Sequence, residues 1–355
     1  MNICIIGVGN IGGMLKEKFL STRSHNIFCI DVDKSKSNTK GNTMVDILKK
    51  SDLIFICLPT PYNTIAHALD TIDITEYLKI INRLTTIPII LKSTLPIGYI
   101  DSIIGEHPEL EKKIIYNPEF STEESIRSGN VQKESQVFGY ATKDLDKFIT
   151  EKLIPLYLDS RIIDSKTKII RLSYEEAEIT KLMRNAYLAM RVSFFNEVAS
   201  LCNEKFCRTE EVIHAISEDS RIGDFYNKVS FGYGGSCFHK DMYYLYEKFD
   251  FKYPLISSIH KSNRMRLLAI RDYIQQYVMK HRSHKITFII SEKEEDSGIS
   301  EIFCYLLDDI PIVNVVKVNP NDGFVKREIL SSDIVVCDKK YNNLLENFEG
   351  KVFNS

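Results

Sequence analysis

Short apolar segments alternate with amphipathic segments over residues 1–120. The apolar segments lie at residues 2–8, 26–33, 52–59, 87–94 and 113–119. After the first of them, Ile11, Met14, Leu15 and Phe19 recur at helical spacing, which predicts a helix. Alternating strands and helices are typical of a parallel sheet with right-handed crossovers. We therefore predict an α/β fold whose first domain, residues 1–172, contains a doubly wound, Rossmann-type parallel sheet.

The pattern changes at Ser173, where apolar residues begin to recur at helical spacing. Ser173 and Glu176 form the S-x-x-E signature of a capping box, which favours a helix start. Apolar positions continue to Cys202, so we predict one helix of roughly 30 residues, about 45 Å long at about 1.5 Å per residue. A helix of this length usually links domains or carries a dimer interface. Further helical patterns extend this predicted central helical domain over residues 173–282.

Strand-like runs return in the last segment of the chain. They read ITFII, PIVNVVKV and DIVVC, with helical patterns between them. We predict a small C-terminal α/β domain, also Rossmann-like, over residues 283–355.

The composition is that of an ordinary globular protein, with 44% apolar and 26% charged residues. The 46 basic residues are balanced by 48 acidic ones and are scattered, which disfavours a nucleic-acid partner. The apolar N-terminus has no positive n-region and is interrupted by glycines, so it fits neither a signal peptide nor a membrane span. The eight cysteines form no C-x-x-C pair, so we expect reduced thiols, no metal site and a cytoplasmic protein.

The sequence GVGNIG follows the first predicted strand and opens the first predicted helix. It matches G-x-G-x-x-G at Gly7, Gly9 and Gly12, and Asp31 follows 19 residues after Gly12. The glycines would let the backbone approach a pyrophosphate, which a helix N-terminus attracts. Asp31 would accept hydrogen bonds from the ribose hydroxyls and repel a 2′-phosphate. The pattern predicts NAD rather than NADP; the alternative is a glycine-rich turn without a ligand.

Two pairs of polar residues are open to two interpretations. Lys181 and Asn185 are spaced i, i+4 on the predicted long helix, so they share one face, which either belongs to a site or meets solvent. Glu119 and Glu123 follow the fifth predicted strand, where paired carboxylates serve acid/base chemistry or begin an ordinary acidic helix.

The segment FGYGGSCFHKD, residues 231–241, places Cys237 after three glycines and before a His, a Lys and an Asp. The glycines lack the spacing of a Walker loop but permit close backbone approach to a ligand. An ordinary thiol, with a pKa of about 8.5, is only slightly ionised at neutral pH, and a neighbouring ammonium would activate it. On this segment alone, Cys237 is either a nucleophile or a half-buried thiol in a turn.

Together these segments resemble the UDP-glucose/GDP-mannose dehydrogenase family over residues 1–275. The matching pieces are GVGNIG, CLPTP (57–61), KSTLPIGY (92–99), NPEFSTEE (117–124), KLMRNAYLAMRVSFFNE (181–197) and DSRIGDFYNKVSFGYGGSCFHKD (219–241). Members of the family oxidise a primary alcohol of a sugar nucleotide to a carboxylate with two NAD. The resemblance therefore implies NAD as cofactor, a sugar nucleotide as substrate and a homodimer formed through the long helix.

The resemblance also implies a covalent mechanism. Cys237 would form a thiohemiacetal with an aldehyde, which is oxidised to a thioester and then released by water. Lys181 and Asn185 would stabilise the oxyanion. Asp241 and Thr94 would hold a water, Glu123 would be the base for hydrolysis, and Glu119 would line the site.

The resemblance carries over two further sets of residues. The implied NAD-binding residues are Gly7, Gly9, Asn10, Ile11, Gly12, Asp31, Lys34, Pro59, Thr60, Thr94, Glu123 and Lys240. The implied substrate-binding residues are Glu119, Phe120, Lys181, Asn185, Arg221, Tyr226, Phe231, Tyr233, Gly234 and Lys293, with Arg221 reaching across the dimer.

Within the family, the Lys-Asp pair after the cysteine is similar to members that oxidise UDP-glucose to UDP-glucuronate, a precursor of polysaccharides. Two features depart from the family pattern: His239 replaces a usual proline, and the short C-terminal domain has no arginine between Lys293 and Ser300. The alternatives are another substrate, GDP-mannose or a UDP-acetamido sugar, and an inactive regulator that binds sugar nucleotides. Retention of all the reacting groups argues against the inactive regulator.

Overall fold

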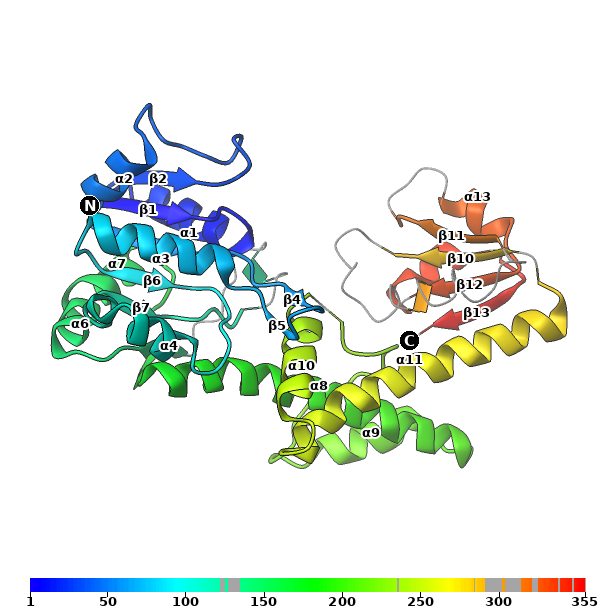
Figure 1. Ribbon diagram of the computed structural model, residues 1–355. Coiled ribbons are helices and arrows are strands. Elements are labelled where there is room, and N and C mark those ends of the chain that lie inside the picture. Colours follow the sequence, from blue (N-terminus) through cyan, green and yellow to red (C-terminus); the bar gives the residue numbers. More distant parts are fainter. Residues whose placement is uncertain are drawn as a thin grey trace. The chain divides into compact units, whose positions relative to one another are not determined.

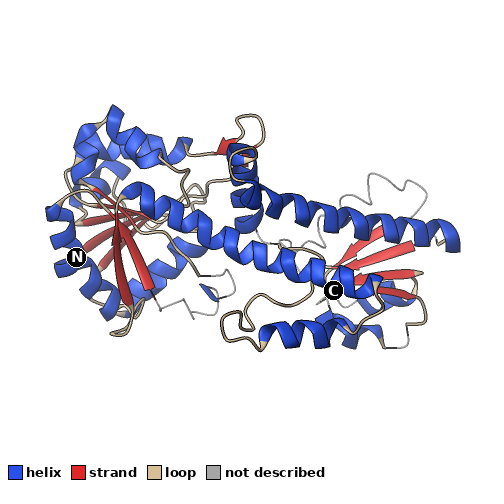
Figure 2. Ribbon diagram, turned by 90° about the horizontal axis from the view of Figure 1, so that it is seen from below, coloured by secondary structure: helices blue, strands red, loops and turns tan. Residues whose placement is uncertain are grey.

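The computed structural model describes residues 1–121, 125–126, 135–234, 236–283, 285–290, 302–303, 314–320, 325–337, 339–346 and 348–354. The chain forms two compact units, Met1–Met183 (unit 1) and Arg184–Ser355 (unit 2). Each unit contains its own sheet (Figure 2). The boundaries of the three predicted domains stay predictions.

Unit 1 is built on a seven-stranded sheet. Its strands, in spatial order, are β2 (Asn26–Ile30), β1 (Asn2–Ile6), β3 (Leu53–Ile56), β6 (Ile89–Leu91), β7 (Ile114–Tyr116), β8 (Ser135–Gly139) and β9 (Lys168–Leu172). All neighbours are parallel except β7 and β8, which pair antiparallel at Tyr116 and Gly139. The order reverses between β1 and β3, and ligands of such sheets bind at the carboxyl ends of the strands at that reversal. The predicted Rossmann-type sheet is confirmed.

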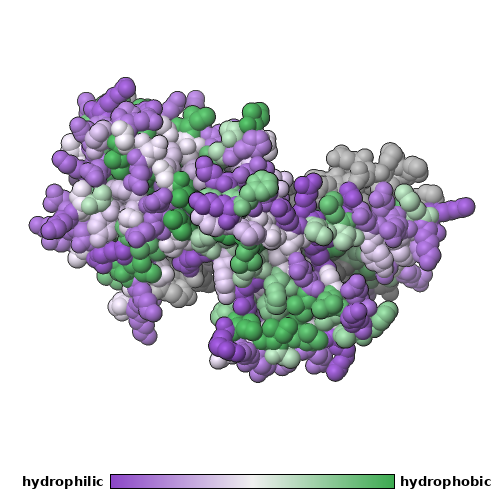
Figure 3. Space-filling view, turned by 60° about the horizontal axis from the view of Figure 1, so that its bottom comes forward, coloured by the Kyte–Doolittle hydropathy of each residue, from purple (hydrophilic) through white to green (hydrophobic). Residues whose placement is uncertain are grey.

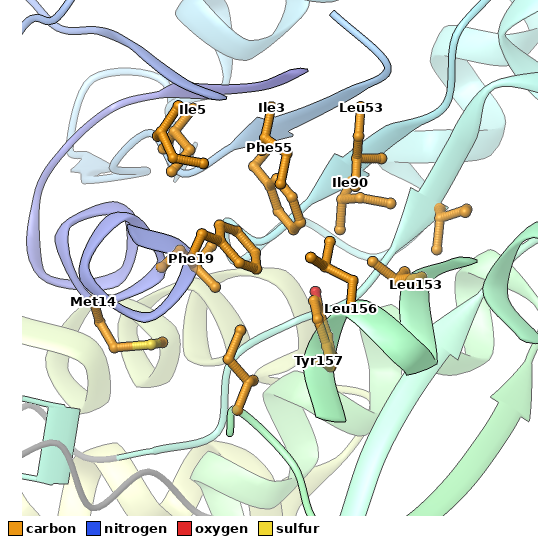
Figure 4. Close-up of a cluster of buried hydrophobic side chains, with 14 of the residues drawn as sticks. Ile3, Ile5, Met14, Phe19, Leu53, Phe55, Ile90, Leu153, Leu156 and Tyr157 are labelled. Carbon is orange, nitrogen blue, oxygen red and sulfur yellow. The ribbon is translucent and has the colours of Figure 1, made fainter. Parts of the chain in front are cut away.

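Helices cover both faces of this sheet. On one face lie α1 (Asn10–Ser21), α6 (Lys143–Phe148) and α7 (Ile154–Asp159), and on the other α2 (Met44–Lys50), α3 (Ile72–Leu84) and α4 (Tyr99–Glu106). Figure 4 shows the core between the sheet and α1, α6 and α7. In this core the centre of the Phe55 ring lies 5.3 Å from that of Phe19 and 6.4 Å from that of Tyr157. Because the strands are buried on both faces, their sequences are continuous apolar runs rather than alternating patterns.

Helix α8 (Tyr174–Glu204) is the predicted long helix and has 31 residues. The Ser173 N–H donates to the Glu176 carboxylate at 2.8 Å, and the Glu176 N–H donates to Ser173 Oγ at 3.4 Å. The predicted capping box therefore sets the start of α8. The helix begins in unit 1 and continues into unit 2, and Figure 1 shows it in green.

Unit 2 combines helices with a small parallel sheet. After α8 come α9 (Thr209–Ser217), α10 (Ser236–Phe249) and α11 (Pro254–His281). The sheet order is β11 (Asn314–Val318), β10 (Lys285–Ile289), β12 (Ile334–Cys337) and β13 (Lys351–Asn354). Leu267, Ile274 and Val278 of α11 pack in one core with β10 and β12, while α13 (Val325–Leu330) packs in a second core. The predicted helical segment and small C-terminal α/β fold are confirmed.

The remaining regular elements of the described residues are short. They are the hairpin of β4 (Tyr62–Asn63) and β5 (Ala68–Leu69), 3-10 helices at Pro108–Lys112 and Lys339–Leu345, and a π-helix at Ile149–Leu153. Among the residues that the structure describes, no helix combines the length and apolar character that crossing a membrane requires.

Candidate functional site

The glycine loop after β1 has the backbone geometry of a dinucleotide-binding turn. Gly7 has a φ of 84°, and an added Cβ would lie 2.8 Å from the carbonyl oxygen of Cys57. A Cβ on Gly12 would lie 1.9 Å from the carbonyl oxygen of Gly7. Only glycine fits at both positions, so β1, α1 and the end of β3 pack closely at the carboxyl edge of the sheet.

The start of α1 fits an anion. Gly9 is its N-cap, so no side chain there occupies the first backbone N–H groups. An added Cβ on Gly9 would meet no atom of the described residues within 4 Å, and Gly9 and Asn10 are both exposed, with Ile11 half-buried. Exposed N–H groups and the helix dipole attract phosphate. These positions fit the pyrophosphate of NAD.

Asp31 follows β2 and holds the glycine loop directly. Its Oδ2 accepts a hydrogen bond from the Val8 N–H at 2.6 Å, and its Oδ1 accepts one from the Asp33 N–H at 2.8 Å. Each carboxylate oxygen keeps a second lone pair, which suits a ribose hydroxyl. Lys34 and Pro59, also predicted to contact NAD, are exposed.

The loops after β3 and β6 are hydrogen-bonded to each other. Thr60 Oγ1 donates to the Thr94 carbonyl at 2.8 Å, and Ser93 Oγ donates to the Leu58 carbonyl at 2.6 Å. These bonds bring Thr60 and the half-buried Thr94 together at the carboxyl edge of the sheet.

Glu119, predicted to line the site, is buried against Lys92 at the end of β6. Lys92 Nζ lies 3.4 Å from Glu119 Oε2, while Glu119 Oε1 accepts from the N–H groups of Phe120 and Ser121. Burial raises the pKa of Glu119, but the Lys92 ammonium and the Ser121 hydrogen bonds outweigh burial and hold that pKa below its ordinary value. Glu119 is therefore an ionised, fixed carboxylate.

A buried polar network beside Glu119 was not predicted. Asn117 Oδ1 accepts from Lys92 Nζ at 3.0 Å and from the Tyr157 hydroxyl at 2.8 Å. Asn117 Nδ2 donates to Gln136 Oε1 at 3.1 Å and to the Val137 carbonyl at 2.8 Å. The sequence signal was Lys92 directly after an apolar strand, because a buried ammonium in that position requires partners.

Glu178, which the sequence analysis also missed, joins α8 to α4. Its carboxylate accepts from the Gly98 N–H at 2.6 Å and the Ile100 N–H at 3.0 Å, so it caps the N-terminus of α4. The side chain is fully buried, and this burial raises its pKa from 4.5 to about 7. Glu178 lies one helical turn before Lys181, but no local sequence pattern indicates its contacts with Gly98 and Ile100.

Lys181 is buried on α8, and its Nζ lies 5.5 Å from the centre of the Phe120 ring. The structure therefore brings together two residues that were predicted to contact the substrate. Lys181 and Asn185 are four residues apart on the same helix, so they share one face of α8.

Asp241 in α10 is fully buried and accepts two hydrogen bonds from side chains. Asn185 Nδ2 donates to its Oδ2 at 2.7 Å, and Lys240 Nζ donates to its Oδ1 at 2.8 Å. This contact joins two predicted catalytic residues, Asn185 and Asp241. It also shows that Lys240, predicted to bind NAD, is an ion-pair partner of Asp241.

The loop before α10 contains buried aromatic residues. Phe231 and Tyr233 are buried, Gly234 is half-buried, and the Tyr233 ring contacts those of Phe238 and His239. Tyr226 has a positive φ of 55° and stacks edge-on against Phe238. Tyr226 and Tyr233, both predicted to bind the substrate, therefore pack against the same ring, Phe238 of α10.

The remaining predicted residues are placed as follows. Arg221 is 87% exposed and forms an ion pair with Asp219 at 2.6 Å. Cys237 belongs to the first turn of α10, but its side chain lies outside the described part of the structure, as do Glu123 and Lys293. Among the described residues, no three His, Cys, Asp or Glu side chains are grouped to hold a metal ion.

Two domain models of one family match this chain. The NAD-binding domain of the UDP-glucose/GDP-mannose dehydrogenase family matches residues 37–157, and its central domain matches residues 175–265. The chain belongs to this family. It is therefore an NAD-dependent sugar-nucleotide dehydrogenase by family, and NAD as cofactor is confirmed.

Individual relatives agree with this assignment, and solved structures show the same fold. The chain is 28% identical to the UDP-glucose 6-dehydrogenase of Campylobacter jejuni over 100% of this chain and 98% of the relative. It is 29% identical to that of Streptococcus pneumoniae over 77% and 74%, respectively. A UDP-glucose dehydrogenase from Pyrobaculum islandicum has the same fold, with a TM-score of 0.81, 20% identity and coverage of 99% and 93%. A UDP-D-ManNAc dehydrogenase from Pyrococcus horikoshii also superposes with a TM-score of 0.81, at 16% identity over 100% and 95%.

Proposed function

We propose that the protein oxidises UDP-glucose to UDP-glucuronate in two NAD-dependent steps, with Cys237 as the covalent nucleophile. The observation that carries the proposal is the buried contact between Asn185 and Asp241, four residues after Cys237 on α10. The buried Asp241 carboxylate fixes the orientation of the Asn185 amide, and fixed donors of this kind are what stabilise a developing oxyanion. UDP-glucose is favoured by the curated relatives that are UDP-glucose 6-dehydrogenases.

Bound NAD would accept the hydride in each oxidation. The first oxidation removes a hydride from C6 and the proton from its hydroxyl, which leaves an aldehyde. The Cys237 sulfur adds to the aldehyde carbon formed in the first oxidation, and the new oxyanion takes a proton to give a thiohemiacetal. The second oxidation removes a hydride from this carbon and the proton from its oxygen, leaving a thioester. Water then adds to the thioester, the carbon–sulfur bond breaks, and the carboxylate and the free thiol are released.

The described residues have defined tasks in this scheme. The Lys181 ammonium and the Asn185 amide stabilise the oxyanion at the sugar C6 oxygen, where fixed donors contribute most. Asp241 accepts a hydrogen bond from the Asn185 amide and so orients that donor. Glu119 is held as an anion by Lys92, which suits a carboxylate that orients a water but does not donate a proton. Glu123 remains the proposed base for thioester hydrolysis.

We further propose a homodimer formed through α8. Tyr187 and Phe194 on this helix are exposed and line an apolar groove of about 430 Å³ that also contains Leu255 of α11. Figure 3 shows apolar side chains gathered on one face of the molecule. Exposed apolar patches of this kind are typical of protein–protein interfaces. A second copy would cover the groove, and we propose that the exposed Arg221 reaches into that copy.

The substrate is tested by counting NADH per sugar nucleotide consumed. We expect two NADH per UDP-glucose, with UDP-glucuronate as product, and no turnover of GDP-mannose or UDP-N-acetylmannosamine. Turnover of one of these two instead would move the assignment to that substrate. NAD binding without turnover of any sugar nucleotide would contradict an enzymatic function altogether.

The nucleophile is tested with Cys237→Ser. Acid formation should fall by about 10³-fold or more, the scale seen when a covalent nucleophile is removed. Cys207→Ser, at an exposed cysteine after α8, is the matched control and should keep full activity. Mass spectrometry of the wild-type protein quenched during turnover should show a sugar-nucleotide adduct that the Cys237 variant lacks. Undiminished activity of that variant would show that another group is the nucleophile.

A further inference from the structure

Residues 230–234, here the substrate loop, form no regular secondary structure, yet Phe231, Gly232 and Tyr233 are all buried. A loop without its own backbone ladder must obtain its hydrogen bonds elsewhere. In this loop they come from side chains of α11 and of the part of α8 that belongs to unit 2.

Asn196 of α8 holds the start of the substrate loop. Its Oδ1 accepts from the Ser230 N–H at 2.8 Å, and its Nδ2 donates to Ser230 Oγ at 3.3 Å. Ser230 Oγ in turn donates to the Gly232 carbonyl at 3.0 Å. Asn196 is only 2% exposed, so both of its polar ends are committed to Ser230 in a buried position.

Asn263 of α11 holds the other end. Its Oδ1 accepts from the Tyr233 N–H at 2.8 Å, and the residue is 3% exposed. A Cβ on Gly232 would lie 2.6 Å from this same oxygen. Gly232 does not have a left-handed backbone conformation. The reason for a glycine at this position is therefore the close approach of Asn263.

A third contact ties the loop to both helices. Arg266 NH2 donates to the Ser230 carbonyl at 3.3 Å, while its NH1 donates to Ser200 Oγ on α8 at 3.0 Å. The hydroxyl of Ser262 on α11 also donates to the Glu197 carboxylate on α8. The two helices therefore form one support beneath the loop.

We propose that Asn196, Asn263 and Arg266 act as positioning residues, a clamp that fixes the substrate loop in its binding shape before the sugar nucleotide arrives. The proposal rests on the proposed function, in which this loop contacts the substrate. The clamp residues act through the loop backbone. A loop that is already ordered costs less conformational entropy when it binds, which raises affinity. The clamp therefore sets affinity for the sugar nucleotide, while NAD binding should not depend on it.

A purely structural role makes a different prediction. Buried asparagines that only stabilise the fold would lower thermal stability when replaced, with substrate affinity unchanged in the folded protein. The clamp instead requires that the affinity for the sugar nucleotide falls while the affinity for NAD stays the same.

The test compares Asn263→Ala and Asn196→Ala with Asn263→Asp, which keeps an acceptor for the Tyr233 N–H. Asn203→Ala, at an exposed asparagine of α8, is the matched control. By calorimetric titration of the full-length protein with UDP-glucose, the two alanine variants should have a Kd raised by about tenfold, the equivalent of one lost hydrogen bond. Asn263→Asp should recover affinity to within about threefold, and the Kd for NAD should stay within about twofold in all variants.

Amide hydrogen exchange of the ligand-free protein supplies a second readout that needs no substrate. Asn263→Ala should speed exchange at Tyr233, and Asn196→Ala at Ser230, while the α10 amides are unchanged. Unchanged exchange at both positions would overturn the clamp, and so would faster exchange with an unaltered Kd for UDP-glucose. If the wild-type protein binds no sugar nucleotide, the proposed function fails and the link to affinity with it, while exchange still decides whether the clamp holds the loop. If Asn263→Ala does not fold, Asn196→Ala and Asn263→Asp carry the same comparison.

Discussion

Helix α8 supplies a hydrogen-bond acceptor to one loop of unit 1 and to one loop of unit 2, and the acceptors differ in chemistry. In unit 1, the Glu178 carboxylate accepts from Gly98 and Ile100 after the loop that carries Thr94. In unit 2, the neutral amide of Asn196 accepts from Ser230 in the substrate loop. The Glu178 carboxylate, whose pKa is raised to about 7, titrates near neutral pH, whereas the Asn196 amide does not titrate.

This difference matters because each acceptor is buried. Burial destabilises the ionised form of a carboxylate. The strength of the Glu178 hydrogen bonds to Gly98 and Ile100 therefore depends on pH. A buried amide carries no charge and holds the substrate loop equally well at any pH. Titration of Glu178 therefore acts on the contacts of the Thr94 loop, whereas the contacts that Asn196 makes to the substrate loop do not titrate.

The largest effect expected from this comparison is a pH dependence of stability. The pKa of Glu178 is raised from 4.5 to about 7 by burial, with the negative charges of Asp101 and Glu175 adding to the shift. The folded chain then binds this proton more tightly than the unfolded chain, so the free energy of unfolding falls as pH rises from about 5 to about 7 and then levels off. The decrease from this one group should be about 3 kcal/mol.

Urea unfolding between pH 5 and pH 8 measures this decrease. Glu178→Gln should flatten the profile because the amide does not titrate. Glu176→Gln is the matched control, at an exposed carboxyl on the same helix. The Ser173 hydrogen bonds lower the pKa of Glu176, so this group makes the free energy of unfolding rise with pH, and it does so at a lower pH than Glu178 titrates. A profile in Glu178→Gln as steep as in the wild type would show that another group titrates.

The second expected effect concerns Gly232 in the substrate loop. Gly232 lies against Asn263, so Gly232→Ala should lower the free energy of unfolding by about 2 kcal/mol, as overpacking does. In an Asn263→Ala background the oxygen is gone, and the nearest remaining atom, Leu267 Cδ2, lies 3.4 Å away. The same substitution should then cost about 1 kcal/mol less, a coupling that a double-mutant cycle in urea measures. Additive losses would mean that Asn263 does not constrain Gly232.

The sequence revealed the parts of the site whose geometry is local. The turn at Gly7, Gly9 and Gly12 is set by residues a few positions apart, and the Ser173–Glu176 capping box is set within one helical turn. The alternation of apolar runs likewise predicted the sheet of unit 1, although not the antiparallel pairing of β7 with β8.

Contacts between distant residues were not predictable in the same way. Asn263 meets Tyr233 from 30 positions away, and Glu178 meets Gly98 from 80 positions away. Lys92 and Glu119 were each visible as polar residues after a strand, but their pairing depends on β6 and β7 being neighbours. Such contacts depend on how the elements pack, which local periodicity does not specify.

The smallest expected effect is at Gly98, the unit 1 counterpart of Gly232. Gly98 has a φ of 82°, and an added Cβ would meet no atom of the described residues within 4 Å, so backbone conformation alone requires glycine there. Gly98→Ala should therefore cost about 1 kcal/mol in the free energy of unfolding, and no second substitution nearby should relieve it. Gly105→Ala, inside α4 with equally open space and no positive φ, should instead stabilise by a few tenths of a kcal/mol to about 1 kcal/mol. If backbone strain is the only cause, the loss from Gly98→Ala should be the same at pH 5 and pH 8. The Gly98 N–H donates to Glu178, so a loss that changes with pH would show that the substitution also disturbs the carboxylate.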